Sequence, residues 1–151
     1  MELKSIQDTK NISKKISKIV KKGDIIFLRG EIGVGKTTFV RFLINHLEVE
    51  NRIKKSDVLS PTFNIVNEYK IGKIKVLHYD LYRIKKYNEV LELDIFDNEE
   101  NYIKIVEWPE LIKLKMKNRI DIKFKYLKKN NNRKIKIVGL GKWKDYKFNE
   151  I

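Results

Sequence analysis

The chain has 151 residues, which is enough for one domain around a single hydrophobic core. It has no cysteine and only two histidines, so disulfides and thiolate metal sites are excluded and a zinc cluster is disfavoured. The formal net charge is +14, the first fifteen residues are polar, and no apolar run approaches a membrane span, so we expect a cytoplasmic protein.

The positive charge is concentrated at the two ends of the chain. Residues 1–23 carry a net charge of +5 and residues 111–151 carry +11, whereas the middle of the chain nets −2. Lysine outnumbers arginine by 28 to 6. A solvated lysine-rich surface is one explanation of this excess, and contact with RNA or an acidic partner is the other.

The first predicted elements are a short strand at residues 3–6 and an amphipathic helix. Asp8 or Thr9 offers an N-cap for this helix, and Gly23 closes it. A short, branched and apolar run at residues 24–29 then predicts a buried strand. The apolar face of the first helix consists of Ile12, Ile16, Ile19 and Val20.

A phosphate-binding loop follows this strand. Its residues match the pattern G-x-x-x-x-G-K-[ST], and a helix extends from it to about Leu47. Glycines allow the backbone N–H groups to point at phosphate oxygens, and the N-terminus of the helix adds partial positive charge. We expect Lys36 to reach the β- and γ-phosphates and the Thr37 hydroxyl to bind Mg²⁺. The matching residues are Gly30, Glu31, Ile32, Gly33, Val34, Gly35, Lys36 and Thr37.

Two carboxylates end later strands of the predicted sheet. A strand at 73–79 ends in Asp80, and a strand at 102–106 ends at Glu107. The carboxyl ends of parallel strands meet at one crevice, so both acids are expected beside the loop, where they would hold Mg²⁺ or orient the attacking water. The alternative is that one of the two merely caps a turn.

The segment Ser60-Pro61-Thr62 interrupts an extended stretch that begins at Val58 and resumes from Phe63 to Tyr69. Its hydroxyls could bond phosphate oxygens or a bound water, or else form local hydroxyl–backbone bonds at a proline kink. The residue types by themselves do not distinguish these two interpretations. A turn at residues 71–73 and a brief helix at 88–93 complete this part of the chain.

The C-terminal part predicts an antiparallel hairpin at about residues 119–140. Apolar residues alternate with lysines on both arms, and Asn130-Asn131-Asn132 forms the turn. Lysines that point outward also oppose edge-to-edge pairing. We therefore predict an α/β fold, a P-loop NTPase-like and mostly parallel sheet flanked by helices, as a single domain over residues 1–151 with this hairpin at its end.

Four segments together resemble the TsaE family, the ATPase component of bacterial tRNA threonylcarbamoyladenosine biosynthesis. The loop at 30–39 is generic by itself, but the other three segments are specific, and their order and spacing match the family over about residues 3–140. Val34 departs from the usual Ala or Ser, and the C-terminal part is more basic than is typical. The three specific segments are Ser60-Pro61-Thr62-Phe63, His78-Tyr79-Asp80-Leu81-Tyr82-Arg83 and Glu107-Trp108-Pro109-Glu110.

The resemblance implies a catalytic set of Lys36, Asp80 and Glu107, with Mg²⁺ on Thr37 and Glu107 and with Asp80 positioning water or metal. Trp108 would pack near the nucleotide or a partner. The implied ATP-binding residues are Ile6, Thr9, Gly30, Glu31, Ile32, Gly33, Val34, Gly35, Lys36, Thr37, Thr38 and Arg133.

The implied partners are TsaB- and TsaD-like proteins, which transfer the threonylcarbamoyl group to adenosine in tRNA. Contact with tRNA would be indirect, through that complex, or direct through the basic C-terminal part. Phosphoryl transfer needs extra positive charge, often an arginine from a partner. Arginine is scarce near the motifs, where Arg29 and Arg41 lie in a strand and a helix. We therefore expect slow hydrolysis alone and stimulation by the partners.

Three other functions compete with this interpretation. A small-molecule or nucleotide kinase would need a substrate-binding insertion and an arginine-rich lid, but the segments between the motifs are short. A non-catalytic RNA-binding module would use the basic termini, yet no stacking platform is apparent. A nucleotide-switched regulator would bind ATP tightly and hydrolyse it only incidentally.

Overall fold

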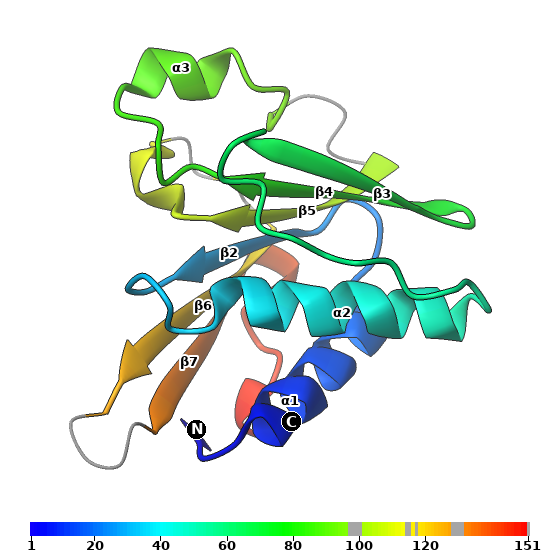
Figure 1. Cartoon of the computed structure of the whole chain (residues 1–151). Helices are drawn as coiled ribbons and strands as arrows, with labels where there is room; N and C mark the ends of the chain where they lie inside the picture. Colours follow the sequence, from blue (N-terminus) through cyan, green and yellow to red (C-terminus); the bar gives the residue numbers. More distant parts are fainter. Residues whose placement is uncertain (97–100, 114–115, 117, 128–131, 151) are drawn as a thin grey trace.

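The computed structural model describes residues 1–96, 101–113, 116, 118–127 and 132–150, which form a layered α/β structure (Figure 1). No helix within these residues is long and apolar enough to cross a membrane. In chain order the elements are β1 (Glu2–Leu3), α1 (Ile6–Ile19), β2 (Ile25–Arg29), α2 (Lys36–Glu50), β3 (Val66–Ile71), β4 (Ile74–Asp80), α3 (Tyr87–Leu91), β5 (Tyr102–Glu107), β6 (Arg119–Tyr126) and β7 (Arg133–Leu140), with short 3₁₀ helices η2 (Pro109–Leu111), η3 (Gly141–Trp143) and η4 (Phe148–Glu150).

The strands form one seven-stranded sheet in the order β1-β7-β6-β2-β5-β4-β3. The central strands β6, β2, β5 and β4 are parallel neighbours, and antiparallel pairs lie at both ends of the sheet. This arrangement confirms the predicted α/β class with a mostly parallel centre. The C-terminal hairpin is part of the same sheet, because β6 pairs with β2 along its first five residues.

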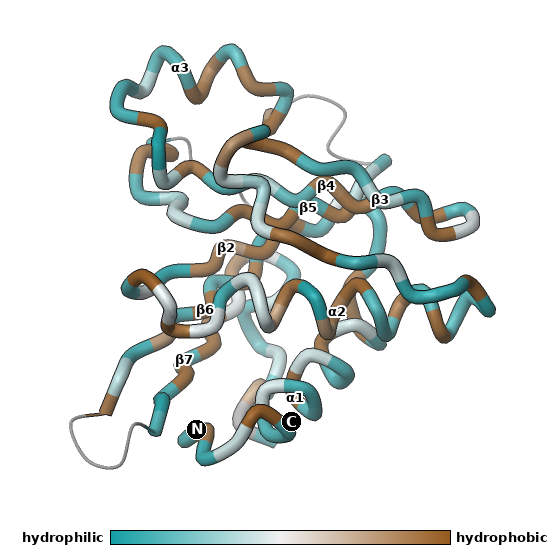
Figure 2. The backbone as a smooth tube through the Cα atoms, in the orientation of Figure 1, coloured by the Kyte–Doolittle hydropathy of each residue, from teal (hydrophilic) through white to brown (hydrophobic). Residues whose placement is uncertain are grey.

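The two faces of the sheet pack against different partners. Ile26 and Leu28 of β2 point to the cluster that includes α1 and α2, whereas Ile25 and Phe27 point to the cluster that includes Val90 of α3. Alternate residues of a strand project to opposite faces, so burial of both faces makes the centre of the sheet continuously apolar. Figure 2 shows this apolar centre and the more polar outer segments.

The start of α1 corrects the predicted cap. Ser5, not Asp8 or Thr9, is the N-cap: its hydroxyl accepts a bond from the Asp8 backbone N–H, and the Asp8 carboxylate accepts one from the Ser5 N–H, at 3.2 Å and 2.8 Å. This reciprocal capping box starts the helix at Ile6, and the first strand is therefore confined to Glu2–Leu3. The helix also ends at Ile19, before the Gly23 that was predicted to close it.

The strand predicted from Phe63 begins instead at Val66. The Ile65 N–H donates to the Pro61 carbonyl, and Ile65 itself has a left-handed φ of 67°. This turn leaves Phe63 85% exposed on the loop. The hairpin arms agree with the predicted span of 119–140, whereas Asn130 and Asn131 of the predicted turn lie outside the described residues.

Candidate nucleotide-binding site

The loop between β2 and α2 has the backbone shape that an anion-binding loop needs. Gly30 has a φ of 137°, and a Cβ on it would lie 2.7 Å from the Phe124 carbonyl oxygen. Gly35, the N-cap of α2, has a φ of 108° and no side-chain cap. Because no side chain occupies the helix N-terminus, its free N–H groups face the loop interior.

Lys36 lies folded inside this loop. Its Nζ donates to the carbonyl oxygens of Gly30 and Glu31 at 2.7 Å and 3.0 Å and lies 3.8 Å from the centre of the Trp108 ring. Burial lowers the pKa of Lys36 below its usual 10.5, while Glu107 opposes this shift. The ammonium group is therefore held by groups that a phosphate oxygen can replace.

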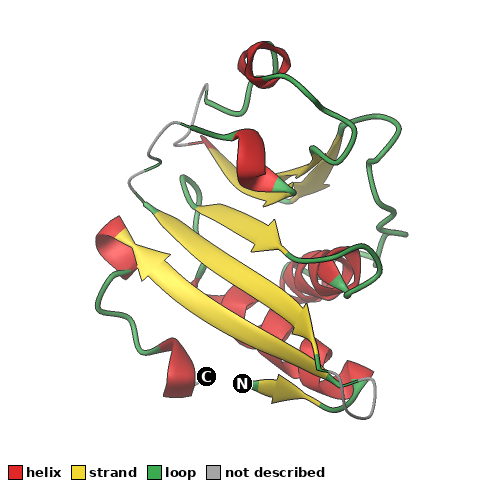
Figure 3. Cartoon of the chain, turned by 90° about the vertical axis from the view of Figure 1, so that its left-hand side faces the viewer, coloured by secondary structure: helices red, strands yellow, loops and turns green. Residues whose placement is uncertain are grey.

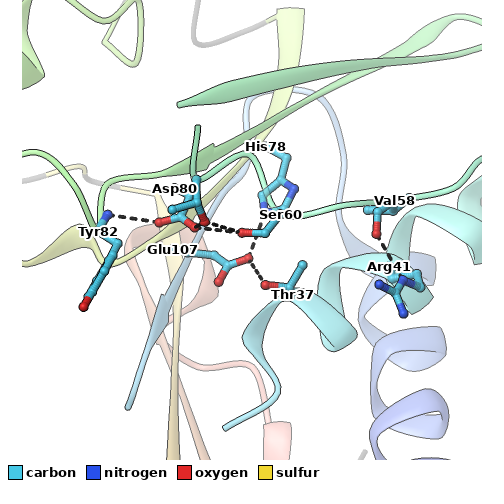
Figure 4. A network of polar contacts seen from close by, with 9 residues as sticks. Thr37, Arg41, Val58, Ser60, His78, Asp80, Tyr82 and Glu107 are labelled. Carbon is cyan, nitrogen blue, oxygen red and sulfur yellow. Dashed lines mark hydrogen bonds and ion pairs between the residues drawn. The ribbon is translucent and has the colours of Figure 1, made fainter. Parts of the chain in front are cut away.

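Thr37 and Glu107 are in direct contact. The Thr37 hydroxyl donates to Glu107 Oε1 at 2.8 Å, and the same oxygen lies 2.9 Å from His78 Nε2 (Figure 4). β4 and β5 are parallel neighbours with Asp80 opposite Glu107, so the register brings the two acids to the same end of the sheet. The predicted convergence of Thr37, Asp80 and Glu107 is thus present in the structure.

The Asp80 carboxylate binds the loop before β3. Asp80 Oδ2 accepts bonds from the Ser60 and Thr62 hydroxyls at 2.8 Å and 2.6 Å, and Oδ1 accepts one from the Tyr82 N–H at 3.0 Å (Figure 4). Neither of the two interpretations of Ser60 and Thr62 described this arrangement, because both considered only phosphate, water and backbone. A sequence gives no register between a loop and a strand eighteen residues later.

These groups line one cavity of about 390 Å³. Ile6, Thr9 and Arg133 are not among its lining residues. Those that line it are Ile32, Gly33, Gly35, Lys36, Thr37, Thr38, Ser60, Thr62, Asp80, Tyr82, Glu107 and Trp108.

Six of the twelve predicted ATP-binding residues do not line this cavity: Gly30, Glu31 and Val34, which belong to the loop, and Ile6, Thr9 and Arg133, which lie outside it in sequence. A Cβ on Gly35 would be 4.0 Å from Arg133 Nε, and this Nε is buried without a hydrogen-bond partner among the described residues. Ile6 and Thr9 lie in the first turn of α1, where Ile6 is 65% exposed and Thr9 is buried. Arg133 is therefore next to the loop with an unused donor, whereas Ile6 and Thr9 make no hydrogen bond to the loop within the described part of the chain.

His78 lies inside a family segment, although no role was predicted for it. His78 is fully buried, its Nδ1 has no hydrogen-bond partner among the described residues, and its Nε2 contacts Glu107. An ionised carboxylate only accepts hydrogen bonds, so Nε2 carries the proton in this pair. The available signal was the spacing: His78 precedes Asp80 by two residues, which places both side chains on one face of β4.

The donor set fits a magnesium ion that is shared with a phosphate chain. No group of three or more His, Cys, Asp or Glu suited to a metal ion occurs within the described part of the chain. Thr37 and Glu107 offer oxygen ligands from a hydroxyl and a carboxylate. Mg²⁺ prefers such hard oxygen ligands and is commonly held by one or two protein groups together with water and phosphates.

The fold and the loop place the chain among P-loop-type α/β proteins, in which a parallel sheet, a glycine loop and a helix N-terminus build a phosphate site. A family model described as "Threonylcarbamoyl adenosine biosynthesis protein TsaE" matches residues 3–135. The chain belongs to the TsaE family.

Individual relatives agree with this assignment. The tRNA threonylcarbamoyladenosine biosynthesis protein TsaE of Rickettsia prowazekii is 37% identical over 88% of this chain and 89% of that protein. TsaE of Aquifex aeolicus is 41% identical over 72% of this chain and 74% of that protein. The crystal structure of Bacillus subtilis YdiB has a TM-score of 0.75 and 26% identity, and the match covers 99% of this chain and 90% of that one.

Proposed function

We propose that this chain is the ATP-binding and ATP-hydrolysing component of the machinery that makes N6-threonylcarbamoyladenosine in tRNA. The observation that carries the proposal is the contact of Thr37 with Glu107 at 2.8 Å, directly beside Lys36 and the glycine loop. A hydroxyl and a carboxylate at this position are the two protein ligands that a Mg-nucleotide needs in a P-loop site. Such work on tRNA would take place in the cytoplasm.

In this proposal the backbone N–H groups of residues 30–38 hold the phosphates, and Lys36 exchanges its two carbonyl partners for phosphate oxygens. The unpaired Nε of Arg133 faces the same loop and offers a further donor to the nucleotide. Ile6 and Thr9 would also lie near the nucleotide, as the family resemblance implies.

Thr37 and Glu107 would hold Mg²⁺, which when bound neutralises charge that develops on the β- and γ-phosphates. Asp80 lies opposite Glu107 and is fixed by the Ser60 and Thr62 hydroxyls, so its carboxylate can orient the attacking water or a metal-bound water. The contact of His78 Nε2 with Glu107 Oε1 positions the Glu107 carboxylate. Two sets of polar contacts therefore meet at this cavity, one that joins Thr37, Glu107 and His78 and one that joins Asp80 to the loop at 60–62.

The arginines near the motifs are engaged elsewhere. Arg29 pairs with Glu110 at 3.2 Å, Arg41 Nε donates to the Val58 carbonyl at 3.0 Å, and Arg83 lies over the Phe63 ring. No arginine lines the cavity within the described residues. We therefore propose that hydrolysis is slow in the isolated chain and that TsaB- and TsaD-like partners supply the missing positive charge, worth roughly 10³–10⁵ in rate.

The test is phosphate release from Mg-ATP by the purified chain, with and without the partner complex. We expect slow release alone and strong stimulation in the complex, whereas equal and fast rates would refute activation by partners. Adding a nucleoside monophosphate as acceptor separates hydrolysis from kinase activity. In cells, inactivation of the chain should reduce threonylcarbamoyl modification of tRNA, and undiminished modification would overturn the pathway role while leaving the nucleotide site untouched.

A further inference from the structure

The face of β6 and β7 that points away from the helices carries four exposed lysines in two opposed pairs. Lys123 lies opposite Lys136, and Lys125 lies opposite Lys134. Directly opposed residues of an antiparallel pair project to the same side, so the four ammonium groups share one surface, here called the lysine face. Figure 3 shows β6 and β7 as the two long strands in front, with α1 behind them and no described helix over the face toward the viewer.

The charge of the lysine face is only partly compensated, because Glu2 of β1 lies opposite Lys134 while Asp121, two residues before Lys123 on the same face, pairs with Arg119. Like charges directly opposite each other destabilise a strand pair. Within the described residues, none of the four ammonium groups takes part in an ion pair. Protection of a sheet edge does not explain Lys123, because its strand is paired on both sides, with Arg29 of β2 and with Lys136 of β7. An anionic partner would remove this repulsion.

A groove borders the lysine face. Its volume is about 700 Å³, and Lys123 and Lys125 lie on its rim. Tyr82 and Trp108 contribute aromatic rings whose centres are 5.0 Å apart, and Tyr82 is 43% exposed. Two carboxylates also line the groove: Glu110, which is paired with Arg29, and Glu31. The other apolar residues that line the groove are Ile32, Leu81, Ile84, Leu111 and Phe124.

We propose that the lysine face and this groove bind single-stranded RNA. The four lysines contact backbone phosphates, and an unstacked base enters the groove and stacks on Tyr82. Ammonium groups beside an exposed ring are what non-specific binding of a single strand requires, whereas an acidic peptide needs no stacking surface. Because Ile32, Tyr82 and Trp108 line both cavities, the bound base would lie next to the candidate ATP cavity. This inference goes beyond the proposed ATPase function, which does not require contact between this chain and RNA.

The experiment is fluorescence anisotropy of a labelled single-stranded RNA of about 12 nucleotides, titrated with the full chain at several salt concentrations. For four phosphate contacts the slope of log K against log salt is expected to be about −3, and the double variant Lys123→Gln/Lys136→Gln should reduce its magnitude by about 1.4. Tyr82→Ala should weaken binding about tenfold, and Tyr82→Phe should restore it. The matched control is Lys15→Gln/Lys22→Gln, which removes the same charge from exposed positions outside the hairpin and should have a smaller effect.

Three outcomes would overturn the proposal: no RNA binding by the wild-type chain, equal effects of the hairpin and control double variants, or displacement of the RNA by polyglutamate at equal charge concentration. The last outcome would assign the lysine face to an acidic protein. Equal affinities for single-stranded and duplex RNA would show that the groove does not bind an unstacked base. A thermal melt shows that each variant is folded, and Mg-ATP binding by the wild-type chain and the lysine variants separates failure of this proposal from failure of the proposed ATPase.

Discussion

Substitution of Lys36 by alanine should abolish tight nucleotide binding without unfolding the chain. In the structure the ammonium group donates two hydrogen bonds, at 2.7 Å and 3.0 Å, to carbonyl oxygens of the loop. If phosphate oxygens replace both carbonyls, two charge-assisted bonds at roughly 1.5–3 kcal/mol each are lost in the variant. The sum of about 3–6 kcal/mol corresponds to a roughly 10²–10⁴-fold weaker affinity.

The assay is isothermal titration calorimetry of ATP in the presence of Mg²⁺. Lys70→Ala is the matched control, because this lysine is 75% exposed on the antiparallel edge of the sheet and should leave the affinity unchanged. A thermal melt of each variant checks that the fold persists. An affinity of Lys36→Ala equal to that of the wild-type chain would refute the assignment of Lys36 to the phosphates.

Three further predictions concern the metal site, the loop and the first helix. Glu107→Ala should still bind nucleotide but lose Mg²⁺-dependent turnover, because the variant lacks the carboxylate that lies beside the Thr37 hydroxyl. Unimpaired turnover would refute the assignment of Glu107 as a metal ligand. Gly30→Ala should lower both the melting temperature and the ATP affinity, since its Cβ would lie 2.7 Å from a backbone oxygen and the φ of 137° is strained; an unchanged melt would contradict this. Hydrogen bonding, chiefly to the Ser5 hydroxyl, lowers the pKa of Asp8 below 3.8, so its contribution to stability is complete above that pH and is lost as the pH falls through the folded-state pKa. Asp8→Asn should therefore reduce the urea midpoint at pH 7 but not in strong acid, and a difference that persists in acid would refute the cap argument.

The convergence of the candidate site residues could be predicted because its signals are local. The spacing of the glycines, Lys36 and Thr37 encodes a loop geometry that depends on neighbouring residues only. Asp80 and Glu107 each follow an apolar run, and in a parallel sheet such positions converge at one edge. The structure places Thr37, Asp80 and Glu107 in one cavity, as this reasoning expected.

The boundaries of elements were less predictable, because short-range contacts compete there. Both Ser5 and Asp8 can cap a helix, and the capping box uses Ser5 as the cap and Asp8 as its N3 partner. The residues before β3 are apolar enough for a strand, but the bond from Ile65 to Pro61 turns the backbone and leaves Phe63 in solvent. A pattern of apolar residues distinguishes neither Ser5 from Asp8 as the cap nor a strand from a turn before β3.

Periodicity and spacing along the chain were enough to predict the class of fold, the glycine loop after β2 and the convergence of the two acids. Contacts between distant segments could be seen only in the folded chain: the bond between His78 and Glu107, the bond from Ser60 to Asp80, and the pairing of β6 with β2. The lysines illustrate the difference. Their number is a property of composition, whereas their grouping on one surface follows from strand register, which pairs residues across a turn and is set by packing of the opposite, apolar face.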